Sequence, residues 1–556
     1  MQSIKVKAIK YFQEKNYIKS LDLFKELSNL DPNNLNYLIY ISLNLMFLKD
    51  FEEAEATLLK IKSINNNIAQ LHFNLGVCYQ HLKKYLKAID AYKNAIEIDP
   101  MYSNAYINLG VLYSEINENE NALVLYKRAI DQNIYSEEIL LNISNLYLNK
   151  NEFEKALVIS KKILSKNPTN ILAMNNIAKI YYETNRPVKA IEYLGDTLKI
   201  DPHSFVTNYN LGIFLKELGR EAEAKKYLKR CIDTNPQFYD AYFALGQIQL
   251  SENNFLLGWE NYEFRWKKSK KRPKSIIINK EIWNPSKGFK RILIWGEQGI
   301  GDQILFMTII QEAAKDFQNI YLALDRRLVP IFNGVLSNVH VFDISTLVPE
   351  SMYDFHLPIA SLGKYYRKTL SSFQSKNIIE PKINNCDKKK FSRAFNCAIS
   401  LKSFNSETGP LRSINISELE GLFKLKNINF FDIQYSSEEI QNKDSLISNL
   451  KKITDFDTYN DIESLFKFIS KCDFVISICN TNAHIAGYLN IPTYVLQPLG
   501  KGDFWYWNNQ HLNKNLWYPS VKVFKQVEQK NWNLPIKKLI ETLRNDFLLK
   551  NNGQRF

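Results

Sequence analysis

A period of 34 residues runs through the first half of the chain, and it constrains the fold more than any other feature. Five prolines stand at positions separated by multiples of 34, namely Pro32, Pro100, Pro168, Pro202 and Pro236. A sequence that repeats at a fixed period of about 20 to 50 residues folds as a stack of similar units, each packed on its neighbours. The first half is therefore predicted to be a solenoid rather than a single globular core.

The positions between the prolines hold small and aromatic residues in fixed places. In the unit that starts at residue 69, Gly76 and Tyr79 fall in a first predicted helix, and Ala88 and Tyr92 fall in a second. Small residues let two antiparallel helices approach, aromatic residues fill the gaps, and proline ends the second helix. About eight copies over residues 1–266 follow this pattern, which resembles the tetratricopeptide repeat and predicts an all-α superhelix.

Such a superhelix has a concave groove that commonly holds an extended peptide or a partner helix. We expect the groove to recognise a peptide or another protein, and the alternative is a scaffold for self-association. Asn74, Asn108, Asn142 and Asn176 recur at the same period and predict a ladder of amides on one face. The ladder would bind the backbone of a peptide or bond neighbouring helices, and the sequence leaves both roles open.

Composition excludes several classes of protein. No stretch has the roughly 18 consecutive apolar residues of a transmembrane helix, and the N-terminus lacks the apolar core of a signal peptide, so we expect a cytoplasmic protein. Six cysteines are scattered without a C-x-x-C pair or Cys/His spacing, which predicts neither a disulfide framework nor a metal site. The net charge of +14 suggests an anionic partner, but no motif for specific nucleic-acid binding accompanies it.

From residue 291 the pattern changes to short apolar runs that alternate with amphipathic segments, the first run being RILIW at 291–295. Alternating strands and helices predict a parallel, doubly wound sheet. Two such Rossmann-like halves with a cleft between them make the architecture called GT-B, and the last helix is expected to return to the first half. The predicted segments are a basic linker at 267–290, a first half at 291–390, a second half at 391–535, and a C-terminal helix and tail at 536–556.

Six segments of this chain resemble one family, in the family's order. They are GWENYEFRW (258–266), GEQGIGDQILF (296–306), ISLKSFN (399–405), GPLRSI (409–414), SICNTNAHIAGYLNIPTYVLQP (477–498) and WYPSVKVFKQ (517–526). They resemble the bacterial tetratricopeptide-repeat glycosyltransferases, which are relatives of the lipopolysaccharide heptosyltransferases and similar in architecture to the O-linked N-acetylglucosamine transferases. The resemblance implies transfer of a sugar from a nucleotide-sugar co-substrate, without a metal or another cofactor, to a polypeptide or glycan acceptor that the groove of the repeats selects.

The resemblance also implies a donor site in the second half. Lys402 and Arg412 follow a predicted strand and would neutralise the diphosphate, the arginine in a bidentate manner. A helix that begins near Asn480 would place its positive end at the phosphates. His484 would donate to a phosphate oxygen or a sugar hydroxyl, or else is a packing residue. The donor-binding residues expected on this basis are Lys402, Arg412, Asn480, Thr481, Asn482, His484, Gly487 and Gln497.

The glycine-rich loop after the first strand is expected to hold the general base. Asp302 is the first candidate and Glu297 the second, because doubly wound folds bind ligands at the carboxyl ends of their strands. The rival role for Asp302 is to cap the following helix. The neighbouring loop residues expected near the acceptor are Gln298, Gly299 and Gly301.

One departure from the family pattern bears on activity. Many members have Asp-Thr where this chain has Cys479-Asn480, so the donor loop lacks a carboxylate. The change would alter the choice of donor or mark a site that no longer turns over. The alternative function is therefore a non-catalytic scaffold with tetratricopeptide repeats and a degenerate sugar-nucleotide site.

Overall fold

The computed structural model describes residues 1–267, 278–346, 348–373, 378–382, 394–405, 408–434 and 450–548. Residues 268–277 of the predicted basic linker, Cys386 and the end of the predicted C-terminal tail lie outside these residues. Within them, no helix is both long and apolar enough to cross a membrane. The chain forms two compact units, Met1–Pro202 and His203–Phe556, and each is described by itself.

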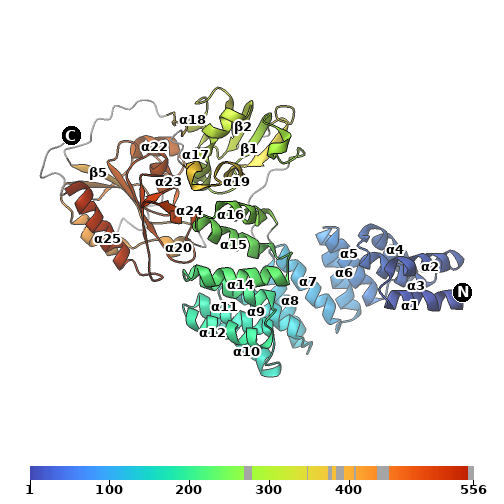
Figure 1. The fold of residues 1–556 in the computed structure, drawn as a ribbon. Coiled ribbons are helices and arrows are strands. Elements are labelled where there is room, and N and C mark those ends of the chain that lie inside the picture. The colour runs from blue at the N-terminus through green and yellow to red at the C-terminus, as the bar shows by residue number, and fades with distance from the viewer. Residues whose placement is uncertain are drawn as a thin grey trace. The chain divides into compact units, whose positions relative to one another are not determined.

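Residues 2–262 form sixteen α-helices in consecutive pairs, as the 34-residue period predicts (Figure 1). The first unit contains α1 (Gln2–Gln13), α2 (Tyr17–Leu30), α3 (Leu35–Phe47), α4 (Phe51–Ile64), α5 (Ala69–His81), α6 (Tyr85–Ile98), α7 (Ser103–Glu115), α8 (Asn119–Asp131), α9 (Glu137–Asn149), α10 (Phe153–Lys166), α11 (Ile171–Glu183) and α12 (Pro187–Ile200). The second unit begins with α13 (Phe205–Glu217), α14 (Glu221–Thr234), α15 (Tyr239–Ser251) and α16 (Phe255–Tyr262).

The turn inside each pair contains one residue in the left-handed region, and these residues are also spaced 34 apart. They are Lys15, Lys49, Lys83, Asn117, Asn151, Asn185, Gly219 and Asn253, with φ between 58° and 75°. In the pairs α5/α6 and α7/α8 the two helices pack closely because a glycine faces an aromatic ring. A Cβ atom on Gly76 would lie 2.5 Å from the ring of Tyr92, which is fully buried. The expected role of small residues in the repeats is thus confirmed.

Two members of the asparagine ladder hold neighbouring helices together. Asn142 in α9 donates from Nδ2 to Tyr126 Oη in α8 at 3.1 Å. Asn176 in α11 donates to Ser144 Oγ and to Asn145 Oδ1, both in α9, at 3.3 and 3.0 Å. Of the two roles that the sequence left open, the bonding of neighbouring helices is the one that these two amides have in the structure.

Beyond the repeats, the second unit contains two sheets whose strands are all parallel (Figure 1). The first has the order β3-β2-β1-β4, with β1 (Arg291–Trp295), β2 (Asn319–Leu324), β3 (Val339–Asp343) and β4 (Phe355–Pro358). The second has the order β12-β9-β8-β5-β6-β7, with β5 (Phe395–Ser400), β6 (Ile428–Asp432), β7 (Leu450–Lys452), β8 (Phe474–Ile478), β9 (Thr493–Gln497) and β12 (Val521–Lys525). In register, Ile292 of β1 lies opposite Ile320 of β2 and Phe355 of β4. The predicted parallel α/β class is therefore confirmed, although β7 and β12 were not predicted.

The helices of the α/β region connect these strands. They are α17 (Ile300–Asp316), α18 (Val329–Phe332), α19 (Leu362–Tyr366), α20 (Gly409–Arg412), α21 (Glu420–Phe423), α22 (Ile462–Ile469), α23 (Thr481–Tyr488), α24 (Trp505–Asn508) and α25 (Asn533–Leu543), and a short antiparallel hairpin joins β10 (Gln510–His511) to β11 (Lys514–Asn515). Helix α17, after the first strand of one sheet, packs against α23, after a central strand of the other. This contact brings the loops that begin the two helices together.

The expectation that the C-terminal helix returns to the first half is wrong. Helix α25 packs on the second sheet, where Ile536 and Leu539 share a buried apolar cluster with Tyr494 of β9. The apolar face of α25 is thereby covered without leaving this sheet. The segment that reaches the first half lies earlier in the chain, since Trp517 makes edge-on ring contact with Phe306 of α17 at 5.7 Å.

The last repeat belongs to the core of the α/β region. Trp259 and Tyr262 of α16 are buried in the same apolar cluster as α17 and α23. Trp259 Nε1 donates to the carbonyl oxygen of Arg367 at 2.8 Å, and its ring meets that of Trp505 edge-on at 5.4 Å. The end of the helical solenoid therefore contacts the segment after β4 of the first sheet and the segment after β9 of the second.

Candidate functional site

A cavity of about 560 Å³ opens in the second unit at the carboxyl ends of the parallel strands. This is the edge at which open α/β sheets bind ligands, and the volume falls within the roughly 300–1,000 Å³ of small-molecule sites. Gly299–Asp302 and Arg327 line the cavity from the first sheet. The residues that line it from the second sheet are Lys402, Ser403, Phe404, Asn405, Arg412, Thr458, Tyr459, Ile462, Cys479, Asn480, Thr481, Asn482, His484, Phe504 and Tyr506.

Asp302 lies in the first turn of α17, three residues after the N-cap residue Gly299. It is therefore not the N-cap, which was the rival role expected for it. Burial, followed by the negative charge of Glu297, raises the pKa of Asp302 to about 6. The hydroxyl of Tyr506, the guanidinium of Arg412 and the backbone N–H of Gly299 oppose this rise, because each favours the ionised carboxylate. A carboxyl group with this pKa accepts a proton near neutral pH.

Arg412 brings a buried positive charge to the wall formed by the second sheet. Its side chain is 7% exposed and donates to the carbonyl oxygen of Cys479 at 2.6 Å and to Ser403 Oγ at 2.9 Å. The guanidinium carbon lies 5.2 Å from the centroid of the Phe504 ring. Nε has no hydrogen-bond partner, and no carboxylate of the described residues forms an ion pair with Arg412. A buried guanidinium without a counter-ion is suited to bind an anion from outside the protein.

The loop after β8 is held by the side chain of Asn480, the N-cap of α23. Its Oδ1 accepts the backbone N–H groups of Asn482 and Ala483 at 3.1 and 3.4 Å, and its Nδ2 donates to Ser400 Oγ at 2.8 Å. Ser477 Oγ donates to the same Oδ1 at 2.8 Å. Two first-turn N–H groups are thus engaged within the protein, so they are not free for a phosphate as the sequence suggested.

The departure from the family pattern at Cys479 leaves this loop ordered. The thiol is buried, and burial raises its pKa well above the usual range. Only its backbone carbonyl serves the site, by accepting the hydrogen bond from Arg412. Any residue at this position would supply that carbonyl oxygen, so the side chain of Cys479 adds no charge to the site.

His484 lines the cavity but is only 3% exposed. Its Nδ1 lies 3.2 Å from Tyr518 Oη, and its ring centroid is 4.8 Å from that of Trp507. Burial lowers its pKa to about 3, so the imidazole is neutral at physiological pH. A Cβ atom on Gly301 would lie 2.7 Å from His484 Cδ2, so this close contact of α17 with α23 requires glycine. When Tyr518 donates to Nδ1, Nε2 carries the ring hydrogen and can donate to a ligand.

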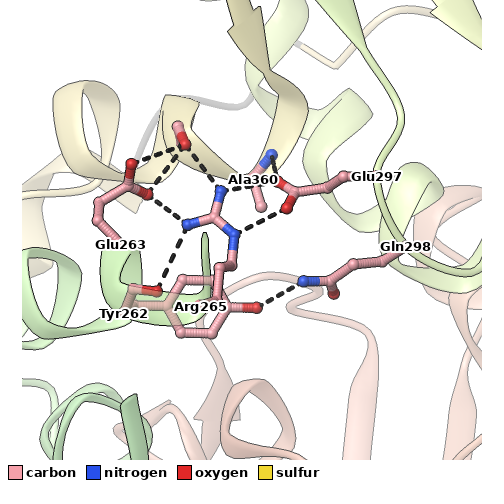
Figure 2. A network of polar contacts seen from close by, with 7 residues as sticks. Tyr262, Glu263, Arg265, Glu297, Gln298 and Ala360 are labelled. Atoms are coloured by element: carbon pink, nitrogen blue, oxygen red, sulfur yellow. Dashed lines mark hydrogen bonds and ion pairs between the residues drawn. The ribbon is translucent and has the colours of Figure 1, made fainter. Parts of the chain in front are cut away.

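Glu297 and Gln298 do not line the cavity, although both were expected in the site. The carboxylate of Glu297 forms a buried, bidentate ion pair with Arg265, with both N–O distances 2.7 Å. Gln298 Nε2 donates to Tyr262 Oη at 2.9 Å. Both side chains point toward the last repeat (Figure 2).

Two of the expected donor-site residues also lie outside the cavity lining. A Cβ atom on Gly487 would lie 2.6 Å from the ring of Tyr518, so this glycine serves the packing of α23. Gln497 donates to the side chain of Asp503 and to the carbonyl oxygen of Phe504, at 3.3 Å in the latter case. Both residues therefore have packing or hydrogen-bonding roles next to the cavity and do not face it.

Arg327 and Tyr459 line the cavity and were not expected from the sequence. Arg327 pairs with Asp325, and its Nη1 donates to the carbonyl oxygen of Tyr459 at 3.1 Å. The guanidinium carbon lies 4.7 Å from the Tyr459 ring centroid. Arg327 follows β2, and Asp302 follows β1, at the same edge of the first sheet. This position after a predicted strand was the one feature of the sequence that could have indicated Arg327.

Comparisons with known proteins support the repeats. Family models described as "Tetratricopeptide repeat" match residues 69–102, 103–133 and 206–238, so the N-terminal region contains tetratricopeptide repeats. Protein FlbA of Caulobacter vibrioides is 23% identical over 330 residues, which are 54% of this chain and 54% of FlbA. The chain thus spans about half the length of the curated relative that it matches.

Solved tetratricopeptide-repeat proteins are among the structures similar to this chain, with low TM-scores. One from Parabacteroides merdae has 14% identity and a TM-score of 0.39, covering 44% of this chain and 96% of its own. YrrB, a tetratricopeptide-repeat protein with an unusual peptide-binding site, has 17% identity and a TM-score of 0.26, covering 34% of this chain and 96% of its own.

Proposed function

We propose that the chain is a glycosyltransferase of the GT-B type, which transfers a sugar from a nucleotide-sugar donor to an acceptor selected by the repeats. One observation carries the proposal. A carboxyl group with a pKa of about 6, Asp302, and a buried guanidinium without a counter-ion among the described residues, Arg412, line the same cavity. A transferase of this class needs a base for the acceptor hydroxyl and a cation for the leaving diphosphate.

In the proposed reaction, the acceptor oxygen bonds to the anomeric carbon of the sugar, and the bond from that carbon to the diphosphate breaks. Asp302 accepts the proton of the acceptor hydroxyl. The nucleoside diphosphate leaves with the electron pair, and the guanidinium of Arg412, which lines the cavity, stabilises its negative charge. Neutral His484 donates from Nε2 to a phosphate oxygen or a sugar hydroxyl.

The acceptor is a polypeptide or a glycan, held in the groove of the repeats. Tetratricopeptide solenoids commonly bind extended peptides on their concave face, which supports this part of the proposal. The contact of the last repeat with the α/β core also supports it, because the end of the solenoid then lies in the same compact unit as the cavity.

Donor binding is tested first, with the full chain and a panel of UDP-, GDP-, ADP-, CMP- and dTDP-sugars. A ligand of the folded state raises the melting temperature by mass action, and calorimetry then gives its Kd. Arg412→Met should weaken the binding of the active ligand, whereas Arg291→Met, which removes an arginine paired with Asp354 outside the cavity lining, should not. Asp302→Asn should keep donor binding but stop the release of nucleoside diphosphate. Absence of binding by every member of the panel at millimolar concentration would remove the basis of the proposal.

A non-catalytic scaffold is the second candidate, and the absence of a carboxylate at Cys479 favours it. In that case one nucleotide sugar binds and Arg412→Met weakens it, but no nucleoside diphosphate is released with any acceptor. Gain of turnover in Cys479→Asp would then trace the lost activity to this position.

A further inference from the structure

Behind the cavity, a buried network surrounds Arg265 in the short helix η1 (Glu263–Trp266), which ends the last repeat (Figure 2). Its guanidinium donates two hydrogen bonds to Glu297, a third to Ser361 Oγ at 2.8 Å and a fourth to Glu263. Glu297 Oε1 also accepts the backbone N–H of Ala360 at 3.1 Å. The network thus joins the last repeat to the segments that follow β1 and β4.

This network restricts geometry more than it can add stability. Arg265 is 1% exposed and Glu297 is 3% exposed, so both charges have lost their water. The desolvation of two buried charges offsets most of their attraction, and apolar side chains of similar size are often at least as stable. The planar fork of arginine, in contrast, holds a carboxylate in one orientation.

Glu297 and Gln298 begin the loop that leads to Asp302. Gln298 is held from two sides, because its Nε2 donates to Tyr262 Oη and its carbonyl oxygen accepts from Gln303 Nε2 at 3.1 Å. Glu297 and Asp302 are only five positions apart in the chain. Fixing the positions of Glu297 and Gln298 therefore limits where Asp302 can lie.

The same repeat also supports a residue that faces the cavity with Asp302. The ring of Tyr262 meets that of Trp505 edge-on at 5.9 Å. Trp505 precedes Tyr506, which lines the cavity with Asp302 and whose hydroxyl favours the ionised form of its carboxylate. Tyr262 thereby contacts both segments that hold the candidate base.

We propose that Arg265 and Tyr262 are positioning residues for Asp302, so that the last repeat forms part of the active site. The inference rests on the proposed function for the role of Asp302 as base. It also assigns Glu297 a part that differs from the expected second base: Glu297 transmits the orientation set by Arg265 to the loop. If the repeats only bound the acceptor, the contacts of Arg265 and Tyr262 with the loop before Asp302 would not be needed.

Hydrogen exchange of the full chain tests the positioning without any need for activity. Arg265→Met should speed the exchange of amides in residues 296–302 by about tenfold or more, because the loop opens locally. Arg367→Met is the matched control, since it removes another nearly buried arginine that pairs with Glu312, near the far end of α17. This control should leave exchange in the loop within about twofold of the wild type.

If Arg265→Met does not fold, two more conservative substitutions still test the proposal. Tyr262→Phe deletes only the hydroxyl that accepts from Gln298, and it should speed exchange in the loop by a smaller factor. Arg265→Lys keeps the charge without the planar fork and should fall between wild type and Arg265→Met. Unchanged loop exchange in the folded variants, or an equal change in Arg367→Met, would overturn the inference.

Kinetics adds a readout that a merely structural role would not change. With an active donor, Arg265→Met and Tyr262→Phe should lower kcat while the Kd of the donor stays within about twofold, because the donor contacts lie on the other sheet. Glu297→Gln should shift the acidic limb of the pH–rate profile, which reports the ionisation of the base, to lower pH. The reason is that the negative charge of Glu297 raises the pKa of Asp302. If the wild type neither binds nor transfers a sugar, the proposed function fails, and the exchange experiment still decides whether the last repeat positions the loop.

Discussion

Replacing Asp302 by asparagine should stabilise the second unit at neutral pH. The carboxyl group has an ordinary pKa of 3.8, and in the fold its pKa is raised to about 6. Because the folded state binds the proton more tightly than the unfolded chain, stability falls as the pH rises from about 4 to about 6. The cost is fully present above the folded pKa and absent below the unfolded one. An amide cannot ionise, so Asp302→Asn removes this cost.

The size of the effect follows from the shift. One pKa unit corresponds to about 1.4 kcal/mol, so the ionised carboxylate costs at most about 3 kcal/mol in the folded state. An amide oxygen is a weaker acceptor than a carboxylate, so part of the favourable interaction with Gly299 and Tyr506 is lost, at about 1 kcal/mol. We expect a net stabilisation of about 1–2 kcal/mol at pH 7.5, which disappears or reverses near pH 4.

Denaturant unfolding followed by tryptophan fluorescence measures this effect. All eight tryptophans lie between residues 259 and 532, so the signal reports the second unit. Asp354→Asn is a control of opposite sign, because the bonded guanidinium of Arg291 lowers the pKa of Asp354. That variant should lose stability at pH 7.5 and approach the wild type as the pH falls. A loss of stability in Asp302→Asn that is equal at pH 7.5 and pH 4 would refute the argument.

Three further predictions concern other parts of the molecule. Arg412→Met should raise the Kd of the bound nucleoside diphosphate by about 10- to 100-fold in calorimetry, and an unchanged Kd would contradict its role as the anion site. Gly76→Ala should destabilise the first unit by about 1–3 kcal/mol, since the added Cβ meets Tyr92 at 2.5 Å, and circular dichroism should report this loss while tryptophan fluorescence does not. A fragment of residues 203–556 should unfold cooperatively by tryptophan fluorescence. A fragment of residues 267–556 should not, because it lacks the buried aromatic residues of the last repeat. Equal behaviour of the two fragments would argue against a core shared by the last repeat and the α/β region.

Several parts of the candidate site were predictable because strand and loop order is written along the chain. The apolar run at 291–295 is β1 in the structure, and Asp302 lines the cavity at the carboxyl end of that strand. His484 and Arg412 line it from loops that follow β8 and β5. The direction of each side chain was not predictable, and this is why Glu297, in the same loop as Asp302, points toward the last repeat instead.

The sequence by itself determined the repeats, because each helix pair packs on its neighbours in the chain. The small residue at Gly76 and the ring of Tyr92 are only 16 positions apart, the same contact recurs at Gly110 and Tyr126, and a small residue returns every 34 positions, so a local pattern specifies the fold. Only the tertiary structure decided that Arg265 meets Glu297 and that His484 meets Gly301. These contacts join segments far apart in the chain, and their partners depend on how whole helices and sheets pack, which no periodic pattern specifies.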